Sequence, residues 1–80
     1  MKKSVFTKKY KKLRELLVQY RDEANVSQVE LAKRLGTRQT FISKCELGER
    51  RVDVVEMMLI ADALGIDPVD VIKELKKVSD

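Results

Sequence analysis

The sequence predicts a single compact all-α domain built from five short helices. Apolar residues recur every three or four positions, which is the spacing of one helix face, and alternation at every second position is almost absent. The three glycines and the one proline each fall where such a segment begins or ends. A chain of 80 residues is long enough for one domain with a modest core, so we expect residues 1–80 to form one unit.

The first two helices are predicted from periodicity and capping residues. A helix over about residues 8–24 is indicated by the apolar positions Tyr10, Leu13, Leu17, Tyr20 and Ala24. Ser27 is suited to cap the next helix, and Glu30 stands where it would complete a capping box. The apolar face of this second helix comprises Leu31, Ala32 and Leu35. Gly36 is suited to the left-handed residue that ends it. Residues 1–7 are expected to be flexible.

The third helix is expected over residues 38–47, with Thr37 as its N-cap. Its inward side is predicted to carry Phe41, Ile42 and Cys45, and Gly48 would end it. The cysteine is interpreted as a small buried apolar residue, because no neighbouring group could activate its thiol.

The last two helices begin at recognisable capping residues. Asp53 is suited to start the fourth helix, with Glu56 completing a capping box. Asp67 followed by Pro68 starts the fifth, since proline is tolerated at the first helical position. This helix is expected to end in a basic, frayed tail at about residues 76–77.

Charge and composition narrow the classes of function. The net charge is +4 and the pI is near 9.3, which suits a polyanionic partner but occurs in many soluble domains. With one cysteine and no histidine, the chain can form no internal disulfide and is not expected to need a metal or a cofactor. There is no nucleophile beside a base and no glycine-rich phosphate loop, so the sequence gives an enzyme little support.

Nothing in the sequence predicts contact with a membrane. The apolar runs are much shorter than a membrane span. Lys2 and Lys3 resemble the start of a signal peptide, but no apolar segment follows them. A disordered tail is the preferred interpretation of these lysines over a DNA-wrapping arm. We therefore expect a cytoplasmic protein.

The spacing of the second and third helices predicts a helix-turn-helix at about residues 28–47. A helix of about eight residues is marginal alone, and a turn of about three residues at Gly36 returns the third helix across it. In this arrangement the first turn of the second member enters the major groove of DNA. That turn holds Arg38, Gln39 and Thr40, whose side chains suit guanine, adenine and the thymine methyl group respectively. Lys44 lies one turn further on the same side.

These residues also resemble a known family. The segment VSQVELAKRLGTRQTFISKCELGERR, followed by IADALGID, is similar to the lambda-repressor-like, or XRE, helix-turn-helix family over about residues 17–67. The resemblance is carried by Gln28, Leu31, Ala32, Leu35, Gly36, Gln39, Ile42, Ser43, Glu46, Gly48, Ala61, Leu64 and Gly65. It implies a five-helix fold, binding to double-stranded DNA and, usually, transcriptional repression or autoregulation.

The resemblance implies roles for individual residues at the start of the motif. Gln28 is expected to contact a phosphate and to brace Gln39, the base-reading glutamine. Thr40 and Lys44 match other groove-facing positions, whereas Arg38 stands where many members carry a smaller polar residue.

At the end of the motif the resemblance implies contacts with the DNA backbone, and two residues depart from the family pattern. Ser43 is expected to reach the DNA backbone, and Arg50 and Arg51 lie in the loop that follows the phosphates. Leu47 and Glu49 depart from the polar or neutral residues that relatives often carry, which puts single backbone contacts in doubt.

Two charged groups outside the motif receive structural interpretations. The resemblance implies that Arg21, late in the first helix, pairs with Glu46, late in the third. Such a pair would orient the third helix without necessarily adding net stability. The basic run in the first helix is interpreted as solvated charge, and it comprises Lys8, Lys9, Lys11, Lys12 and Arg14.

A homodimer is expected from the fourth and fifth helices. The segment VVEMMLIADAL is apolar almost all round, so it should bury more than one face. Val55 and Leu59 form a stripe beside the presumed core positions, which are Val54, Met57, Met58 and Ala61. With Val69 and Ile72 they are the predicted dimer contacts, whereas Val71, Leu75 and Val78 lie on another side of the fifth helix. The alternative is that all of these residues complete a small core.

The sequence therefore favours a DNA-binding regulator that reads a palindromic operator as a homodimer. The alternative is a protein-interaction module, such as an antitoxin or an adaptor, that uses the same fold. Gln28 and Gln39 together with Arg51 favour the DNA-binding interpretation, because an adaptor has no need for them.

Overall fold

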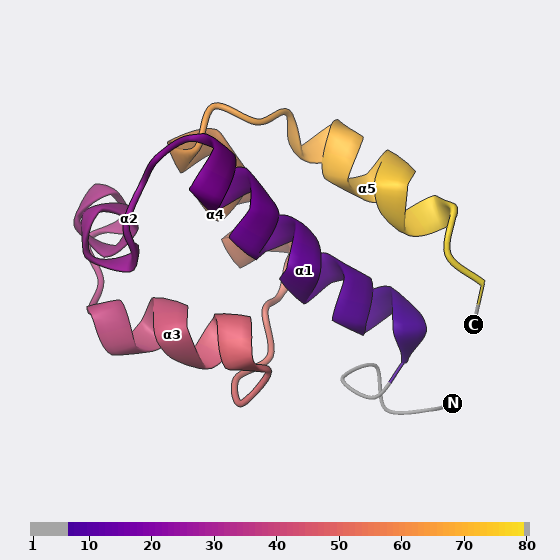
Figure 1. The fold of residues 1–80 in the computed structure, drawn as a ribbon, viewed down its shortest axis with the longest axis horizontal. Helices are drawn as coiled ribbons and strands as arrows, with labels where there is room; N and C mark the ends of the chain where they lie inside the picture. The colour runs from indigo at the N-terminus through magenta and orange to yellow at the C-terminus, as the bar shows by residue number, and fades with distance from the viewer. Residues whose placement is uncertain (1–6, 80) are drawn as a thin grey trace.

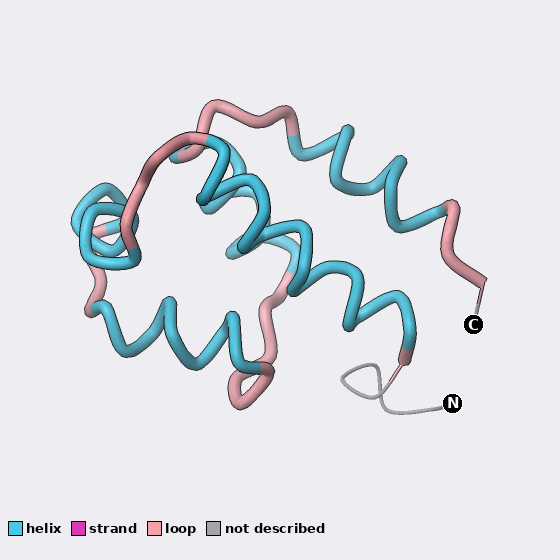
Figure 2. Tube along the Cα trace, viewed as in Figure 1, coloured by secondary structure: helices cyan, strands magenta, loops and turns pink. Residues whose placement is uncertain are grey.

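The computed structural model describes residues 7–79, in which all the regular structure is helical (Figures 1 and 2). The elements in chain order are α1 Lys8–Glu23, α2 Gln28–Leu35, α3 Gln39–Leu47, α4 Val54–Ala63 and α5 Pro68–Lys76. The five-helix prediction is confirmed. The predicted flexible segment 1–7, with Lys2 and Lys3, lies outside the described residues apart from Thr7, which instead caps α1 by accepting a hydrogen bond from the Tyr10 N–H.

Helix α1 crosses the centre of the view in Figure 1, with α5 along one side of it and α3 along the other. It packs against both of these helices, α2 packs against α3 and α4, and α4 packs against α5. The end of α5 and the beginning of α1 lie at the same end of the molecule (Figure 1). Within residues 7–79, no helix combines the length and the apolar character needed to cross a membrane.

The core is made by one face of each helix and by three residues of the connecting segments, Val26, Val52 and Leu64. It comprises Tyr10, Leu13, Leu16, Leu17, Val26, Leu31, Ala32, Ile42, Cys45, Val52, Met57, Ile60, Ala61, Leu64 and Val71. The most completely buried of the large side chains are Leu31, Ile42 and Val71, one each from α2, α3 and α5. Full burial of such a side chain contributes about 1.5–3 kcal/mol, so these helices owe their stability to packing rather than to length.

The helix ends follow the predicted capping residues with two exceptions. Ser27 caps α2 and Asp67 with Pro68 starts α5, whereas Asp53 and Glu56 form a complete capping box at α4. The predicted reciprocal half of the box at α2 is wrong. The carboxylate of Glu30 pairs with Arg34 one turn later, at 3.3 Å.

The second exception is the start of α3, which lies one residue later than predicted. Gly36 has a φ of 67° and ends α2, and the N–H of Thr37 donates to the Ala32 carbonyl at 2.9 Å. Thr37 therefore completes the end of α2, and the N-cap position of α3 falls on the following residue. The N-cap of α3 is Arg38, whose side chain makes no capping hydrogen bond.

The prediction for the core of α4 is also partly wrong. Met57 and Ala61 are buried as expected, but Val54 and Met58 are exposed and Ile60 is buried in their place. A short helix on the outside of a small domain can bury only one face. The side chains of Val54 and Met58 therefore remain in solvent.

The basic run of α1 is not uniformly solvated as predicted. Lys8 and Lys11 are exposed, but the ammonium group of Lys9 donates to the backbone carbonyls of Leu75, at 3.2 Å, and of Val78. A lysine at these carbonyls satisfies groups that the end of a helix leaves unpaired, and its charge complements the helix dipole. Lys9 therefore ties the beginning of α1 to the end of α5.

A buried hydrogen bond fixes the loop between α3 and α4. The hydroxyl oxygen of Tyr10 accepts the Val52 N–H at 2.6 Å, and both residues are buried. Without this acceptor the amide would have no partner in the core.

We expect Tyr10→Phe to lower the free energy of unfolding by about 1–3 kcal/mol, because it leaves the Val52 N–H buried without an acceptor. Chemical denaturation measures the change. Tyr20→Phe is the matched control, since Tyr20 is only partly buried and its hydroxyl makes no hydrogen bond within residues 7–79. Equal losses in the two variants would contradict this role of Tyr10.

Candidate nucleic-acid interface

Helices α2 and α3 form the predicted helix-turn-helix, joined by the left-handed Gly36 and an extended Arg38. The inward side of α3 carries the buried Ile42 and Cys45 and the half-buried Phe41, as predicted. Burial raises the pKa of the Cys45 thiol, which keeps it protonated and unreactive.

The opposite side of α3 presents the predicted groove-facing residues. Arg38, Gln39, Thr40 and Lys44 are all exposed, the first three in consecutive positions at the start of the helix. Ser43 is half-buried between them and the core. The N-cap and first turn of α3, with Lys44 one turn further along, thus present two cations, an amide and a hydroxyl, all able to donate hydrogen bonds to nucleic-acid groups.

Arg21 and Glu46 make the contact that the sequence predicted. The Nε of Arg21 donates to Glu46 Oε2 at 2.7 Å, and its Nη2 donates to Oε1 at 3.0 Å. The side chains are 13% and 11% exposed. The hydrogen bond to Glu46 raises the pKa of Arg21, and its Nη1 also donates to the Val26 carbonyl at 3.0 Å. The pair thereby joins α1, α3 and the loop before α2.

The ion pair continues into a chain of side-chain hydrogen bonds. Gln28 Nε2 donates to Glu46 Oε1 at 2.8 Å, and Gln39 Nε2 donates to Gln28 Oε1 at 2.6 Å. The predicted brace between the two glutamines is present. Sequence reasoning missed the contact between Gln28 and Glu46, although both residues had been assigned to the motif. This series of side-chain hydrogen bonds connects the interior of the protein to the exposed start of α3.

The loop after α3 lies close to the side chain of Arg14 from α1. Gly48 has a φ of 81°, and a Cβ there would lie 2.9 Å from the Arg14 guanidinium, so a side chain could not be added without displacing Arg14. Arg14 therefore packs against the loop and is not solvated charge as predicted. Its Nε is buried and has no hydrogen-bond partner within residues 7–79.

Arg50 is held by protein contacts. Its guanidinium pairs with Glu56 at 2.9 Å, donates to the Arg51 carbonyl at 2.9 Å and lies 4.5 Å from the centre of the Phe41 ring. The hydrogen bond from Arg50 lowers the pKa of the Glu56 carboxyl. Arg51 is exposed as well, and its side chain makes no hydrogen bond or ion pair within residues 7–79. Both arginines of this loop are therefore accessible to a ligand, and Arg51 could bind one without giving up a contact to the described residues.

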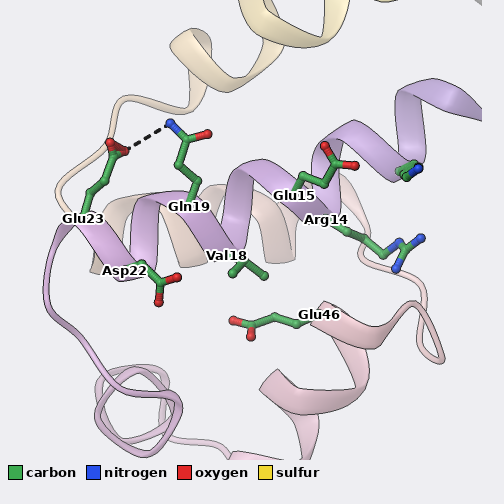
Figure 3. Close-up of a pocket in the computed structure, with 8 residues that line it drawn as sticks. Arg14, Glu15, Val18, Gln19, Asp22, Glu23 and Glu46 are labelled. Atoms are coloured by element: carbon green, nitrogen blue, oxygen red, sulfur yellow. Dashed lines mark hydrogen bonds between the residues drawn. The ribbon is translucent and has the colours of Figure 1, made fainter.

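An open cavity of about 570 Å³ lies between α1 and the end of α3 (Figure 3). Its lining comprises Lys11, Arg14, Glu15, Val18, Gln19, Asp22, Glu23 and Glu46. The acidic side chains in this lining do not favour a polyanion. Within residues 7–79, no three His, Cys, Asp or Glu side chains are grouped to hold a metal ion.

Comparison with known proteins places these features in a family. The sequence profile of the helix-turn-helix family matches residues 17–71. The structure is similar to that of an XRE-family like protein from Pseudomonas syringae pv. tomato str. DC3000, with 40% sequence identity and a TM-score of 0.85 over 90% of this chain and 88% of the other. The fold is also similar to that of the clp gene regulator ClgR from C. glutamicum, with 24% identity and a TM-score of 0.77 over 89% and 92% of the two chains. No curated protein matches the sequence.

We expect Arg21→Ala or Glu46→Ala to lower the free energy of unfolding by about 3 kcal/mol, because either change leaves a charge nearly buried without its partner. A double-mutant cycle measures the coupling. The exposed pair Glu30 and Arg34 is the control, and its coupling should be about 0.5 kcal/mol or less. Absence of coupling between Arg21 and Glu46 would contradict the assigned contact.

Proposed function

The chain belongs to the XRE-type helix-turn-helix family, and from this premise we propose that it is a sequence-specific regulator that binds double-stranded DNA. The observation that carries the proposal is the exposed start of α3, where Gln39 is held in place by Gln28. An ordered amide at the start of the second member of a helix-turn-helix is positioned to read base edges in the major groove.

Within this proposal the residues divide between bases and phosphates. Arg38, at the N-cap of α3, contacts base edges together with Gln39, Thr40 and Lys44 of the helix itself. Gln28 has one amide N–H left after its bond to Glu46, and that N–H is directed to a phosphate. The hydroxyl of Ser43 supplies a further contact to the DNA backbone.

Arg51 supplies the phosphate contact of the loop after α3, because its charge is exposed. Arg50, which is also exposed, supplies a second phosphate contact of this loop, while its pairing with Glu56 helps to hold the loop in shape.

We further propose that the protein acts as a homodimer on a palindromic operator and serves as a repressor or autoregulator. The support is an exposed apolar surface that comprises Val54, Val55, Met58 and Leu59 of α4 with Val69 and Ile72 of α5. Contiguous apolar surface of this kind marks an interaction site. A two-fold dimer would place two copies of α3 in successive major grooves, about 34 Å apart.

Selection of bound sequences from a random duplex pool tests the function as a whole. A consensus of two inverted half-sites is expected. Recovery of no consensus would favour the alternative, a protein-interaction module with the same fold.

Gln39→Ala should weaken binding to the selected site by about 1–3 kcal/mol and relax preference at one or two base pairs. Arg51→Ala should weaken binding to all sequences alike and reduce the slope of log K against log salt by about 0.9. Titrations on selected and scrambled duplexes over a range of salt separate the two effects. The assignment fails if both variants lose the same affinity on every duplex.

Leu59→Lys should convert the dimer to a monomer, because it places a charge in the apolar contact between two copies of α4. Analytical ultracentrifugation at tens of micromolar measures the mass. Val29→Lys is the matched control, since Val29 is equally exposed but lies on α2, and it should sediment as wild type. A monomeric wild type, or a dimeric Leu59→Lys, would rule this interface out.

A further inference from the structure

We propose that Glu46 is a specificity-determining residue of the DNA interface: through Gln28 it fixes the direction of the Gln39 amide, so that Gln39 selects adenine over guanine. The inference rests on the proposed DNA binding and adds a reason for the choice of base. Glu46 acts at a distance as a positioning residue, because two side chains separate it from the exposed face.

The series of hydrogen bonds from Glu46 through Gln28 to Gln39 has its donor-to-acceptor direction set at the buried end. An arginine side chain can only donate hydrogen bonds, and an ionised carboxylate can only accept them. Arg21 donates to both oxygens of Glu46, at 2.7 and 3.0 Å, so both oxygens act as acceptors. Any other group that bonds to Glu46 must therefore be a donor.

Gln28 transmits this direction outward. Its amide could in principle face Glu46 with either end, but only the NH₂ end can bond to a carboxylate. With Nε2 at 2.8 Å from Glu46 Oε1, the carbonyl oxygen of Gln28 is turned toward α3. That oxygen is an acceptor, so the next residue in the chain must donate.

Gln39 is the residue that donates, with its Nε2 2.6 Å from Gln28 Oε1. Because one of its two N–H groups is used, the Gln39 amide offers the DNA one donor and the carbonyl acceptor. In the major groove adenine presents the complementary pair, the N7 acceptor and the N6 amino donor. Guanine presents two acceptors, N7 and O6, and cannot satisfy the Gln39 carbonyl.

The same reasoning identifies the substitution that would remove the preference. In Glu46→Gln the side chain keeps its shape, and an NH₂ group at the position of Oε1 loses the hydrogen bond from Arg21 Nη2 but can donate to the carbonyl of an inverted Gln28, while the remaining oxygen still accepts from Arg21 Nε. An inverted Gln28 then donates to Gln39 Oε1, and Gln39 turns both of its N–H groups toward the DNA. Two donors match guanine, so this variant should accept guanine as well as adenine.

The experiment is selection from a random duplex pool with wild type, Glu46→Gln and Arg21→Lys. At the base pair that Gln39→Ala identifies, wild type should prefer adenine over guanine by about tenfold or more. The preference should fall to about twofold or less in Glu46→Gln, with the other positions of the site unchanged. Arg21→Lys disturbs the same ion pair but leaves the carboxylate, so it should keep the preference of wild type.

The outcomes separate the inference from the function on which it rests. If wild type selects no consensus, the proposed DNA binding fails. If wild type selects a consensus with adenine and Glu46→Gln keeps the same preference, the DNA binding stands and the role of Glu46 is overturned. Loss of the preference in Arg21→Lys as well would also overturn it, since disturbed packing would then explain the result.

A measurement on the free protein makes the test independent of DNA. The chain has three glutamines, and their side-chain NH₂ signals can be assigned by NMR. In Glu46→Gln the signals of Gln28 and Gln39 should shift, whereas those of Gln19, which bonds to the exposed Glu23, should not. A folded variant with unchanged Gln39 signals would contradict the inversion of the Gln28 and Gln39 amides.

Discussion

The contact on which the rest of the interface depends is the buried ion pair between Arg21 and Glu46. It joins the end of α1 to the end of α3, and through the Val26 carbonyl it also holds the loop that leads into α2. A buried pair of charges adds little net stability, because desolvation offsets the attraction between them. Its effect is to fix geometry, since Glu46 also accepts a hydrogen bond from Gln28, which in turn accepts one from Gln39.

The fold could be predicted from the sequence because its information is local. Apolar spacing located all five helices, and the capping residues Ser27, Asp53 and Asp67 located three of the starts. The errors arose where one residue had two possible partners. Thr37 could cap α3 or complete the end of α2, and Glu30 could bond to the Ser27 backbone or to Arg34. Only the three-dimensional arrangement decides between such partners.

The candidate site was predicted less completely, because side-chain partners are not local. The exposed face of α3 followed from spacing, and the family resemblance supplied the partners of Arg21 and Gln39. Nothing in the sequence near Arg50 indicates that Glu56 and Phe41 would engage it, and nothing near Lys9 indicates a contact with Val78 at the far end of the sequence. Helix periodicity assigns a residue to a face but does not say which charged groups that face will meet.

The elements assigned to assembly and to base reading are connected by a hydrogen bond and an ion pair. The Nη1 of Arg34 on α2 donates to the Ala63 carbonyl of α4 at 2.9 Å, and Glu56 of α4 holds the loop that carries Arg51. In the proposed dimer, contact between two copies of α4 would therefore also fix the relative orientation of the two copies of α2 and α3. Because α2 braces α3 through Gln28, the spacing of the half-sites would follow from the packing of α4 without any further contact between the reading elements.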